Sequence, residues 1–166
     1  MLNYFYSIPK RAFNTAAALS CAGLMAYAYY SQYIDGLEPC PLCIFQRLAL
    51  LLVGVMFTLA ALHNPEKMGS RIYAGLIGLS ALLGAAIAGR HVWLQNLPED
   101  LVPECGPGLD YMLDVLPLTE TLSIVLNASG ECADINWQFL GLSMPAWVLI
   151  WFVGLGVLGV WRNLRT

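Results

Sequence analysis

The sequence predicts an all-α membrane protein that folds as a four-transmembrane-helix bundle. Apolar residues make up 58% of the 166-residue chain and charged residues only 11%, a composition outside the range of soluble globular domains. The mean hydropathy of +0.64 agrees with this. Four apolar segments follow one another, the fourth being the shortest, and a helix needs ~20 such residues to cross a bilayer. The rest of the chain is too short for a separate soluble domain, so residues 1–166 are expected to form one membrane domain.

Each apolar segment is expected to form one helix, and the four helices should cover residues 12–33, 44–62, 72–92 and 145–161. Lys10 and Arg11 precede the first segment, but this segment is too long for the apolar core of a signal peptide. The first helix should therefore remain in the mature protein. Small residues recur within three of the segments, which is typical of helices that pack closely in lipid. They are Ala18, Ala22 and Ala26, then Ser80, Gly84 and Ala88, then Gly154, Gly156 and Gly159.

The charged residues predict how the helices are oriented. Lys and Arg are enriched in cytoplasmic loops, and six of the eight basic residues fall on one side of the four-helix arrangement: Lys10, Arg11, Lys67, Arg71, Arg162 and Arg165. Both termini are therefore expected in the cytoplasm. The long loop 93–144 contains acidic residues but no Lys or Arg, so it is expected on the opposite side, together with the short loop 34–43. Within the long loop, the apolar segment Leu118–Leu126 is expected to form a short helix at the membrane surface.

The five cysteines divide into one buried residue and one set of four. Cys21 lies in the middle of the first expected helix, where a free thiol behaves as a small apolar side chain. Cys40, Cys43, Cys105 and Cys132 all fall on the extracytoplasmic side, where disulfides persist.

Three interpretations of this set of four remain open: redox chemistry, static disulfides that brace the loops of a structural or assembly protein, and a metal site. A Cys-x-x-Cys ring constrains the unfolded chain little and is easily reduced, and a four-cysteine zinc site usually has two short-spaced pairs. Redox chemistry is therefore favoured, and no metal is expected.

Polar residues are expected to meet at the outer ends of three helices. Cys43 should lie at the start of the second helix, where the helix dipole stabilises a thiolate, and Arg47 follows one turn later on the same face. The third helix ends in His91 and Gln95, and the first ends in Gln32. A lipid-soluble quinone suits such a site, because its carbonyl oxygens accept hydrogen bonds and its reduction builds negative charge. Ordinary interfacial positions, with a snorkelling arginine, are the alternative.

Three stretches of the sequence resemble one known family. They are PCPLCIFQR in the first outer loop, HVWLQ at the end of the third helix, and SGECADINWQFLGLSMPAW from Ser129 to Trp147. Together with four spans and the loop charges, they resemble the DsbB family of disulfide-bond formation proteins. Members of this family are quinone reductases of the bacterial inner membrane that reoxidise the periplasmic thiol oxidase DsbA.

The resemblance implies a relay of electrons through two cysteine pairs. A reduced, thioredoxin-fold partner of DsbA type would attack the disulfide between Cys105 and Cys132, at Cys105. The resulting dithiol would reduce the bond between Cys40 and Cys43, and Cys43, beside Arg47, would pass the electrons to ubiquinone or menaquinone. His91, Gln95 and Gln32 are the further residues expected to contact the quinone. The expected location is the inner membrane, with the redox loops in the periplasm, and the net charge of −3 gives no sign of a nucleic-acid partner.

Overall fold

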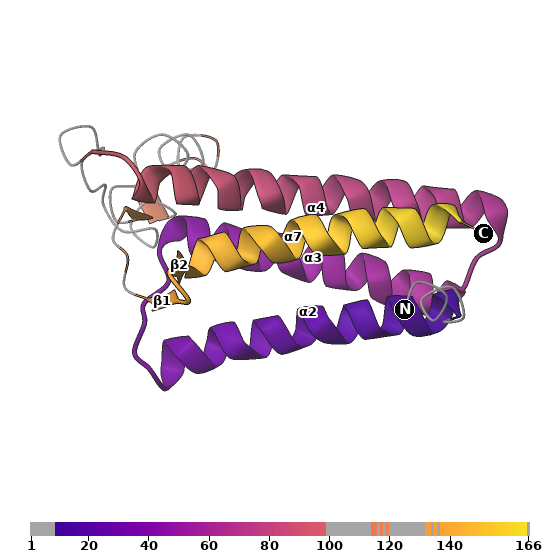
Figure 1. Cartoon of the computed structure of the whole chain (residues 1–166), viewed down its shortest axis with the longest axis horizontal. Coiled ribbons are helices and arrows are strands. Elements are labelled where there is room, and N and C mark those ends of the chain that lie inside the picture. Colours follow the sequence, from indigo (N-terminus) through magenta and orange to yellow (C-terminus); the bar gives the residue numbers. More distant parts are fainter. Residues whose placement is uncertain are drawn as a thin grey trace.

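Four long helices and one short β-hairpin form the described part of the chain (Figure 1). The computed structural model describes residues 9–98, 114–115, 117, 119, 132–133, 135 and 137–165. The helices are α2 (Lys10–Tyr33), α3 (Pro41–His63), α4 (Lys67–Gln95) and α7 (Met144–Leu164), and the strands are β1 (Gln138–Phe139) and β2 (Leu142–Ser143). The four long helices that the sequence predicts are therefore confirmed, and each lies within a few residues of its expected bounds.

The helices lie side by side along one axis, with α4 packed on α7, α3 on α4 and α2 on α3. The start of α2 and the end of α7 lie at the same end of the bundle (Figure 1). The turn between α2 and α3, the end of α4 and the hairpin lie at the other end, which is referred to below as the cysteine end. Residues far apart in the sequence therefore meet at the cysteine end.

The start of α3 is determined by its capping residues. Cys40 is the N-cap, and its sulfur accepts a hydrogen bond from the backbone N–H of Cys43, with an N···S distance of 3.4 Å. Pro41 occupies the first helical position, where a missing N–H has no cost. The apolar run begins only at Ile44, which is why the sequence placed this boundary a few residues late. At the other end, Asn64 adopts a left-handed conformation with φ 39°, which ends the helix.

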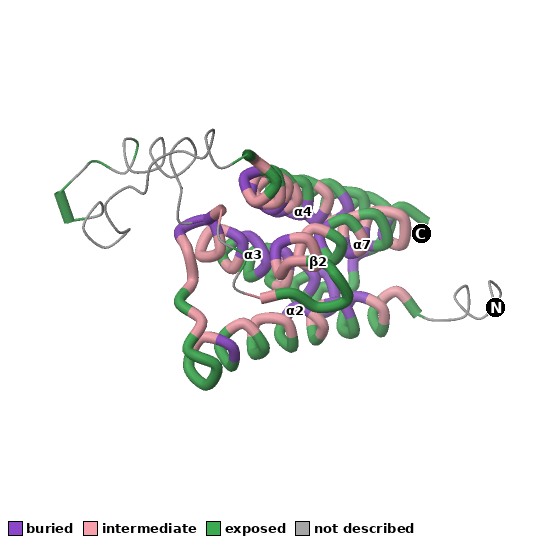
Figure 2. The backbone as a smooth tube through the Cα atoms, turned by 60° about the vertical axis from the view of Figure 1, so that its left-hand side comes forward, coloured by how far each residue is buried: buried purple, intermediate pink, exposed green. Residues whose placement is uncertain are grey.

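The surface of the bundle is apolar in the way expected of a membrane protein. Three of the four helices, α3, α4 and α7, are long and apolar enough to cross a membrane. Their outer faces carry exposed leucines such as Leu48, Leu79 and Leu82, whereas the buried residues lie between the helices (Figure 2). α2 has 24 residues, which at ~1.5 Å per residue is long enough to span, but its polar residues lower its hydropathy. A fourth span, the orientation and the single domain stay predictions.

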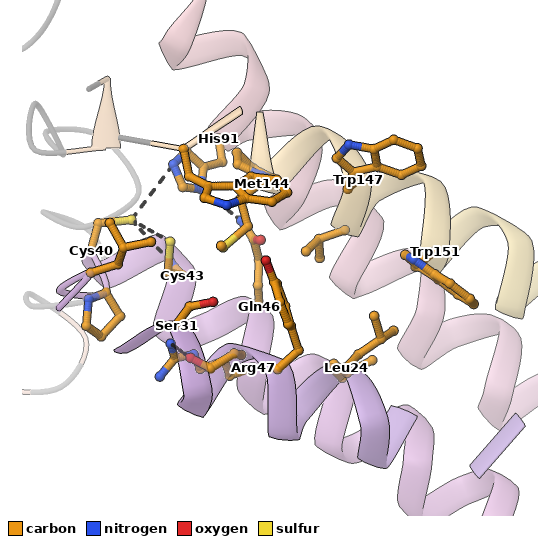
Figure 3. A pocket seen from close by; sticks show the side chains of 18 of the residues that line it. Leu24, Ser31, Cys40, Cys43, Gln46, Arg47, His91, Met144, Trp147 and Trp151 are labelled. Atoms are coloured by element: carbon orange, nitrogen blue, oxygen red, sulfur yellow. Dashed lines mark hydrogen bonds between the residues drawn. The ribbon is translucent and has the colours of Figure 1, made fainter. Parts of the chain in front are cut away.

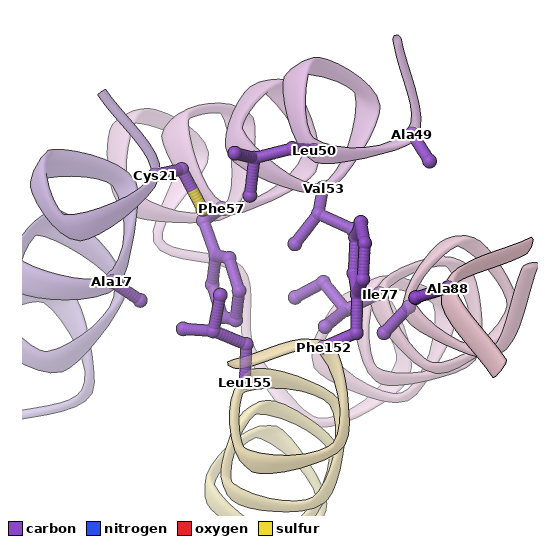
Figure 4. Packing of buried hydrophobic residues seen from close by; sticks show 11 residues of the cluster. Ala17, Cys21, Ala49, Leu50, Val53, Phe57, Ile77, Ala88, Phe152 and Leu155 are labelled. Atoms are coloured by element: carbon purple, nitrogen blue, oxygen red, sulfur yellow. The ribbon is translucent and has the colours of Figure 1, made fainter. Parts of the chain in front are cut away.

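Small residues allow the helices to approach closely around an apolar core (Figure 4). A Cβ added to Gly84 of α4 would lie 2.3 Å from the ring of Phe152 on α7. A Cβ added to Gly159 of α7 would lie 2.7 Å from the ring of Phe57 on α3. Ser80 and Ala88 are buried as well, so the packing face predicted for the third helix is confirmed.

The packing face predicted for the first helix is wrong at two of its three residues, since only Ala18 packs against the core. Ala22 and Ala26 are exposed, and the buried face of α2 runs through Asn14, Ala17 and Cys21 instead. The expectation followed small residues only, whereas here a larger polar side chain, Asn14, is paired inside the interface. Asn14 and Asn163 of α7 exchange two amide hydrogen bonds of 3.2 and 3.1 Å.

A further hydrogen bond joins the same end of the bundle to α4. The hydroxyl of Ser70 donates to the backbone oxygen of Asn163 at 2.6 Å. Because Asn14, Ser70 and Asn163 are all fully buried, these bonds are shielded from water and link α2, α4 and α7 at the end opposite the cysteines.

The β-hairpin before α7 was not expected, because the sequence placed all of 93–144 in a loop. Gln138 pairs with Ser143 and Phe139 with Leu142. Leu140 and Gly141 have positive φ angles of 52° and 78° between the strands, as a two-residue turn with this twist requires. Cys105 and the surface helix expected at Leu118–Leu126, apart from residue 119, lie outside the described residues.

Candidate functional site

Three cysteine sulfurs meet at the cysteine end of the bundle. The Sγ atoms of Cys40 and Cys43 are 3.0 Å apart, and both cysteines are free thiols (Figure 3). Cys132 lies against the same pair, with its Sγ within 4.8 Å of Cys40 Sγ. It is also a free thiol and only 1% exposed. Cys40 is thus the central sulfur, in reach of one partner on its own helix and one from the long loop.

A buried histidine from α4 lies beside these sulfurs. The Nε2 atom of His91 is 3.8 Å from Cys40 Sγ, and its Nδ1 atom is 2.9 Å from the amide nitrogen of Gln46 on α3. Both side chains are almost fully buried. An amide nitrogen can only donate a hydrogen bond, so Nδ1 accepts and the ring proton lies on Nε2, facing the sulfur. Gln46 therefore fixes the orientation of His91, and with the amide in this position the ring proton lies on Nε2.

Hydrogen bonding between the thiols shifts the pKa values of Cys40 and Cys132 in opposite directions. Cys40 donates to Cys132 and Cys43, and these hydrogen bonds, with burial, raise the pKa of Cys40 above the ordinary range of a thiol. The same bond from Cys40 lowers the pKa of Cys132 to about 7, and the nearby His91 acts in the same direction. When all three thiols are reduced, Cys132 is therefore more readily ionised than Cys40, and the thiolate is the nucleophile in thiol–disulfide exchange.

Arg47 is anchored to α2 rather than extended into solvent. Its guanidinium donates to the side-chain oxygen of Gln32 and, at 3.0 Å, to the backbone oxygen of Ala28. Its Cζ atom also lies 5.4 Å from the centre of the Tyr29 ring. These contacts hold the positive charge one helical turn after Cys43. Whether Arg47 also reaches the membrane interface stays an open alternative.

Cys40, Cys43 and Arg47 border a cavity of about 660 Å³. Its walls come from α2, α3, α4, α7 and the hairpin, and its apolar lining is rich in aromatic rings: Tyr27, Trp137, Phe139, Trp147 and Trp151. The hairpin is braced over the cavity, because the indole of Trp147 donates to the backbone oxygen of Phe139 at 3.1 Å. Figure 3 shows Cys43, Gln46 and Arg47 on one side of this space and Trp147 and Trp151 on the other.

Two polar atoms of the cavity wall have no hydrogen-bond partner among the described residues. They are the hydroxyl of Ser31, a residue only 2% exposed, and the side-chain oxygen of Gln95. Buried polar groups without a partner are uncommon and costly, and both of these residues line the cavity. A hydroxyl and a carbonyl group without partners thus lie at the cavity wall, both shielded from solvent.

The structure brings together most of the predicted site residues. Cys40, Cys43, Arg47, His91 and Gln95 all line the cavity, and Cys132 contacts Cys40. Gln32 does not line the cavity and binds Arg47 instead. The roles of these residues stay predictions.

Sequence reasoning missed Ser31, Gln46 and the aromatic wall. Gln46 was visible inside CIFQR, three positions after Cys43, and that spacing on a helix was a usable signal. The inward position of Ser31 had no such signal.

Comparisons with known proteins identify the family. A family model described as "Disulfide bond formation protein DsbB" matches residues 10–162. The disulfide bond formation protein B of Nitrosococcus oceani is 54% identical over 146 residues, covering 88% of this chain and 86% of that protein. The protein of the same name from Hahella chejuensis is 54% identical over 136 residues, or 82% of each chain. That from Methylococcus capsulatus is 55% identical over 147 residues, or 87% of this chain and 90% of that protein.

The match runs from the first residue of α2 into the last turn of α7, so it includes every described residue of the sulfur cluster and the cavity. The resemblance seen in the sequence is confirmed. The chain is a membrane protein and belongs to the DsbB family of disulfide bond formation proteins.

Proposed function

We propose that this protein makes disulfide bonds by taking two electrons from a periplasmic DsbA-type dithiol and passing them to a quinone in the inner membrane. The observation that carries the proposal is the sulfur chain itself. Cys132, Cys40 and Cys43 stand in order, and Cys43 borders an apolar cavity that also contains a fixed cation. Such a chain has an entry point outside the bilayer and an exit point beside it.

The first steps are thiol–disulfide exchanges and move no atom far. Cys132 is buried, so the partner's thiol is assigned to attack the Cys105–Cys132 bond at Cys105, and Cys132 leaves as a thiolate. The partner is then held in a mixed disulfide with Cys105. The Cys132 thiolate attacks Cys40 in the Cys40–Cys43 disulfide, an S–S bond forms between Cys132 and Cys40, and Cys43 is released as a thiolate. The partner's second thiol displaces Cys105, and the partner leaves oxidised. The Cys105 thiolate attacks Cys132 to restore the Cys105–Cys132 bond, and Cys40 leaves as a thiolate, so that Cys40 and Cys43 hold the two electrons. The Nε2 proton of His91 faces Cys40 and stabilises negative charge on the sulfurs during these exchanges.

The cavity fits a quinone by size and by chemistry. Ligand pockets of this class enclose roughly 300–1,000 Å³ and are mainly apolar, with a few placed polar groups. The unpaired hydroxyl of Ser31 is available to donate to a quinone carbonyl, and the unpaired oxygen of Gln95 is available to accept from a quinol hydroxyl. Arg47 lies next to Cys43 and stabilises charge that develops on the ring oxygens. A bound quinone supplies the acceptor for two electrons and two protons.

A quinone-reduction assay tests the proposal. The full chain in detergent or nanodiscs is mixed with a reduced thioredoxin-fold thiol oxidase and ubiquinone or menaquinone, and quinol formation is followed together with oxidation of the partner. Cys43→Ala is expected to abolish quinol formation. Cys21→Ala is the matched control, because Cys21 lies in the α2–α3 interface and does not line the cavity, and it should keep full activity.

Two outcomes would oppose the proposal. Unchanged quinol formation in Cys43→Ala, with the helical fold intact, would favour cysteines that only brace the outer loops. Reaction of the Cys40–Cys43 turn with impermeant thiol reagents from the cytoplasmic side alone would remove the route from the periplasm.

A further inference from the structure

The sulfur cluster at the cysteine end is also a set of metal ligands. The Sγ atoms of Cys40 and Cys132 and a ring nitrogen of His91 all lie within 4.8 Å of one another, and His91 and Cys132 are buried. Two thiolates and one imidazole are ligands that select a cation of the Zn²⁺ type. We propose that the fully reduced protein binds one such cation through Cys40, His91 and Cys132, and that the bound cation blocks the electron relay.

The distances already approach those of a tetrahedral site. With Zn–S bonds of ~2.3 Å and Zn–N bonds of ~2.0–2.1 Å, neighbouring ligand atoms stand about 3.5–3.8 Å apart. The Nε2 atom of His91 is 3.8 Å from Cys40 Sγ, so this edge of the tetrahedron needs almost no change. Cys43, with its sulfur 3.0 Å from Cys40, is a further thiol beside this cluster.

The surroundings of His91 suit a metal ligand as well. Metal-bound histidines generally have a hydrogen-bond partner on the other ring nitrogen, and Gln46 provides one at 2.9 Å. A half-turn of the Gln46 amide places its oxygen, rather than its nitrogen, against Nδ1. The ring proton then lies on Nδ1, and Nε2 faces the sulfurs with a free lone pair. Cys40 and His91 also line the cavity, which gives the cation a path to the site.

The redox state controls whether this site exists. A disulfide sulfur is a poor ligand, so oxidation of the Cys40–Cys43 pair or of Cys132 removes thiolates that the cation needs. Binding releases the proton of each ligating thiol and transfers no electron. Once bound, the cation holds Cys40 and Cys132 as thiolates and keeps them from exchanging with Cys43. This blocking effect rests on the proposed function, whereas the binding itself does not.

A cobalt titration of the full chain tests the binding without quinone or partner. The protein in detergent is reduced, desalted without oxygen, and titrated with Co²⁺ and then Zn²⁺. Reduced protein is expected to take up one Co²⁺, with thiolate-to-cobalt absorption and the visible bands of a tetrahedral ion, and Zn²⁺ should displace it. Protein oxidised beforehand should show neither signal.

Variants identify the ligands. His91→Ala and Cys132→Ser should each weaken binding by more than about 100-fold, since even the loss of an outer hydrogen-bond partner costs roughly 10–100-fold. Gln46→Leu removes only such an outer partner and should weaken binding by roughly 10–100-fold. His91→Cys should retain binding, which separates loss of a ligand from loss of the fold. Cys21→Ala, outside the cluster, should bind as the unmodified chain does.

Equal Co²⁺ binding by oxidised and reduced protein, or full binding by both His91→Ala and Cys132→Ser, would overturn the inference.

The blocking effect of the cation is measured separately. Zn²⁺ should stop quinol formation during turnover in the unmodified chain and in Cys21→Ala, and a chelator should restore it. A chain that oxidises its partner but takes up no Co²⁺ contradicts the metal site alone. A chain that binds Co²⁺ but never reduces quinone contradicts the proposed function alone.

Discussion

Replacing Arg47 with methionine removes the cation beside Cys43 but keeps an unbranched apolar chain in place of the arginine stem. In the structure, Gln32 and Ala28 each accept one hydrogen bond from this guanidinium, and the group has five N–H donors. Arg47 also lines the cavity. A hydrogen bond to a charged group contributes about 1.5–3 kcal/mol, which corresponds to a loss of roughly 10–100-fold in kcat/KM for quinone. Under the proposed function the cation binds a quinone oxygen before electron transfer as well as during it, so the KM for quinone should rise, whereas exchange with the entering thiols should not change.

The assay measures initial rates of quinol formation against quinone concentration, at a fixed excess of reduced partner. Exchange between the partner and the cysteine pairs is followed separately, without quinone, and should be unchanged. Arg90→Met is the matched control, because Arg90 lies over the ring of Trp93 at 4.5 Å and does not line the cavity. Its KM for quinone should stay within about twofold of the starting value. Equal KM values for Arg47→Met and Arg90→Met would refute the reasoning, since the charge at position 47 would then have no part in binding the quinone.

Three further changes test the rest of the structure. Gln46→Leu removes the hydrogen bond that fixes the imidazole of α4, so kcat for quinol formation should fall while KM for quinone stays constant; a change in KM alone would contradict this. Asn163→Ala leaves Asn14 without its amide partner and should lower the free energy of unfolding by about 1–3 kcal/mol, since hydrogen bonds between membrane helices average ~0.6 and reach ~1.7 kcal/mol each. The double variant with Asn14→Ala should cost less than the two single costs added. Gly84→Ala forces a Cβ to within 2.3 Å of a phenyl ring on α7 and should destabilise the bundle by about 1–3 kcal/mol. Gly89→Ala, with nothing within 4 Å, should be neutral or slightly stabilising in the same thermal unfolding measurement.

The helices could be predicted because their signal is local and strong. A run of ~20 apolar residues has few alternatives in a chain of this composition, and α3, α4 and α7 follow such runs closely. Helix faces were harder to predict, because the face of α2 depends on what lies opposite it. Asn14 is buried only because Asn163, on a helix far away in the sequence, offers a matching amide.

The residue types of the site could be predicted, but not all of their contacts. A Cys-x-x-Cys pair at a helix start and an arginine one turn later are fixed by helical geometry, and the structure has them as expected. The contact between Cys132 and Cys40 depends on the path of the long loop, which spacing does not determine. The contact made by Gln32 could not be predicted either. Its depth at the end of α2 was predicted, yet its side chain turns to Arg47 rather than into the cavity.

The closeness of the sulfurs has opposite consequences in the two redox states. Exchange requires Cys132 to stay within reach of Cys40, and the same proximity, with His91 on one side, creates the proposed ligand set. A tighter cluster would speed exchange and strengthen metal binding together, so geometry alone cannot separate the two. What separates exchange from metal binding is the lifetime of the reduced state, because an oxidised pair offers the cation no thiolates. Under the proposed function that lifetime depends on the supply of quinone to the cavity. Inhibition by Zn²⁺ should therefore deepen as the quinone concentration is lowered, although the cation and the quinone use different atoms of the site.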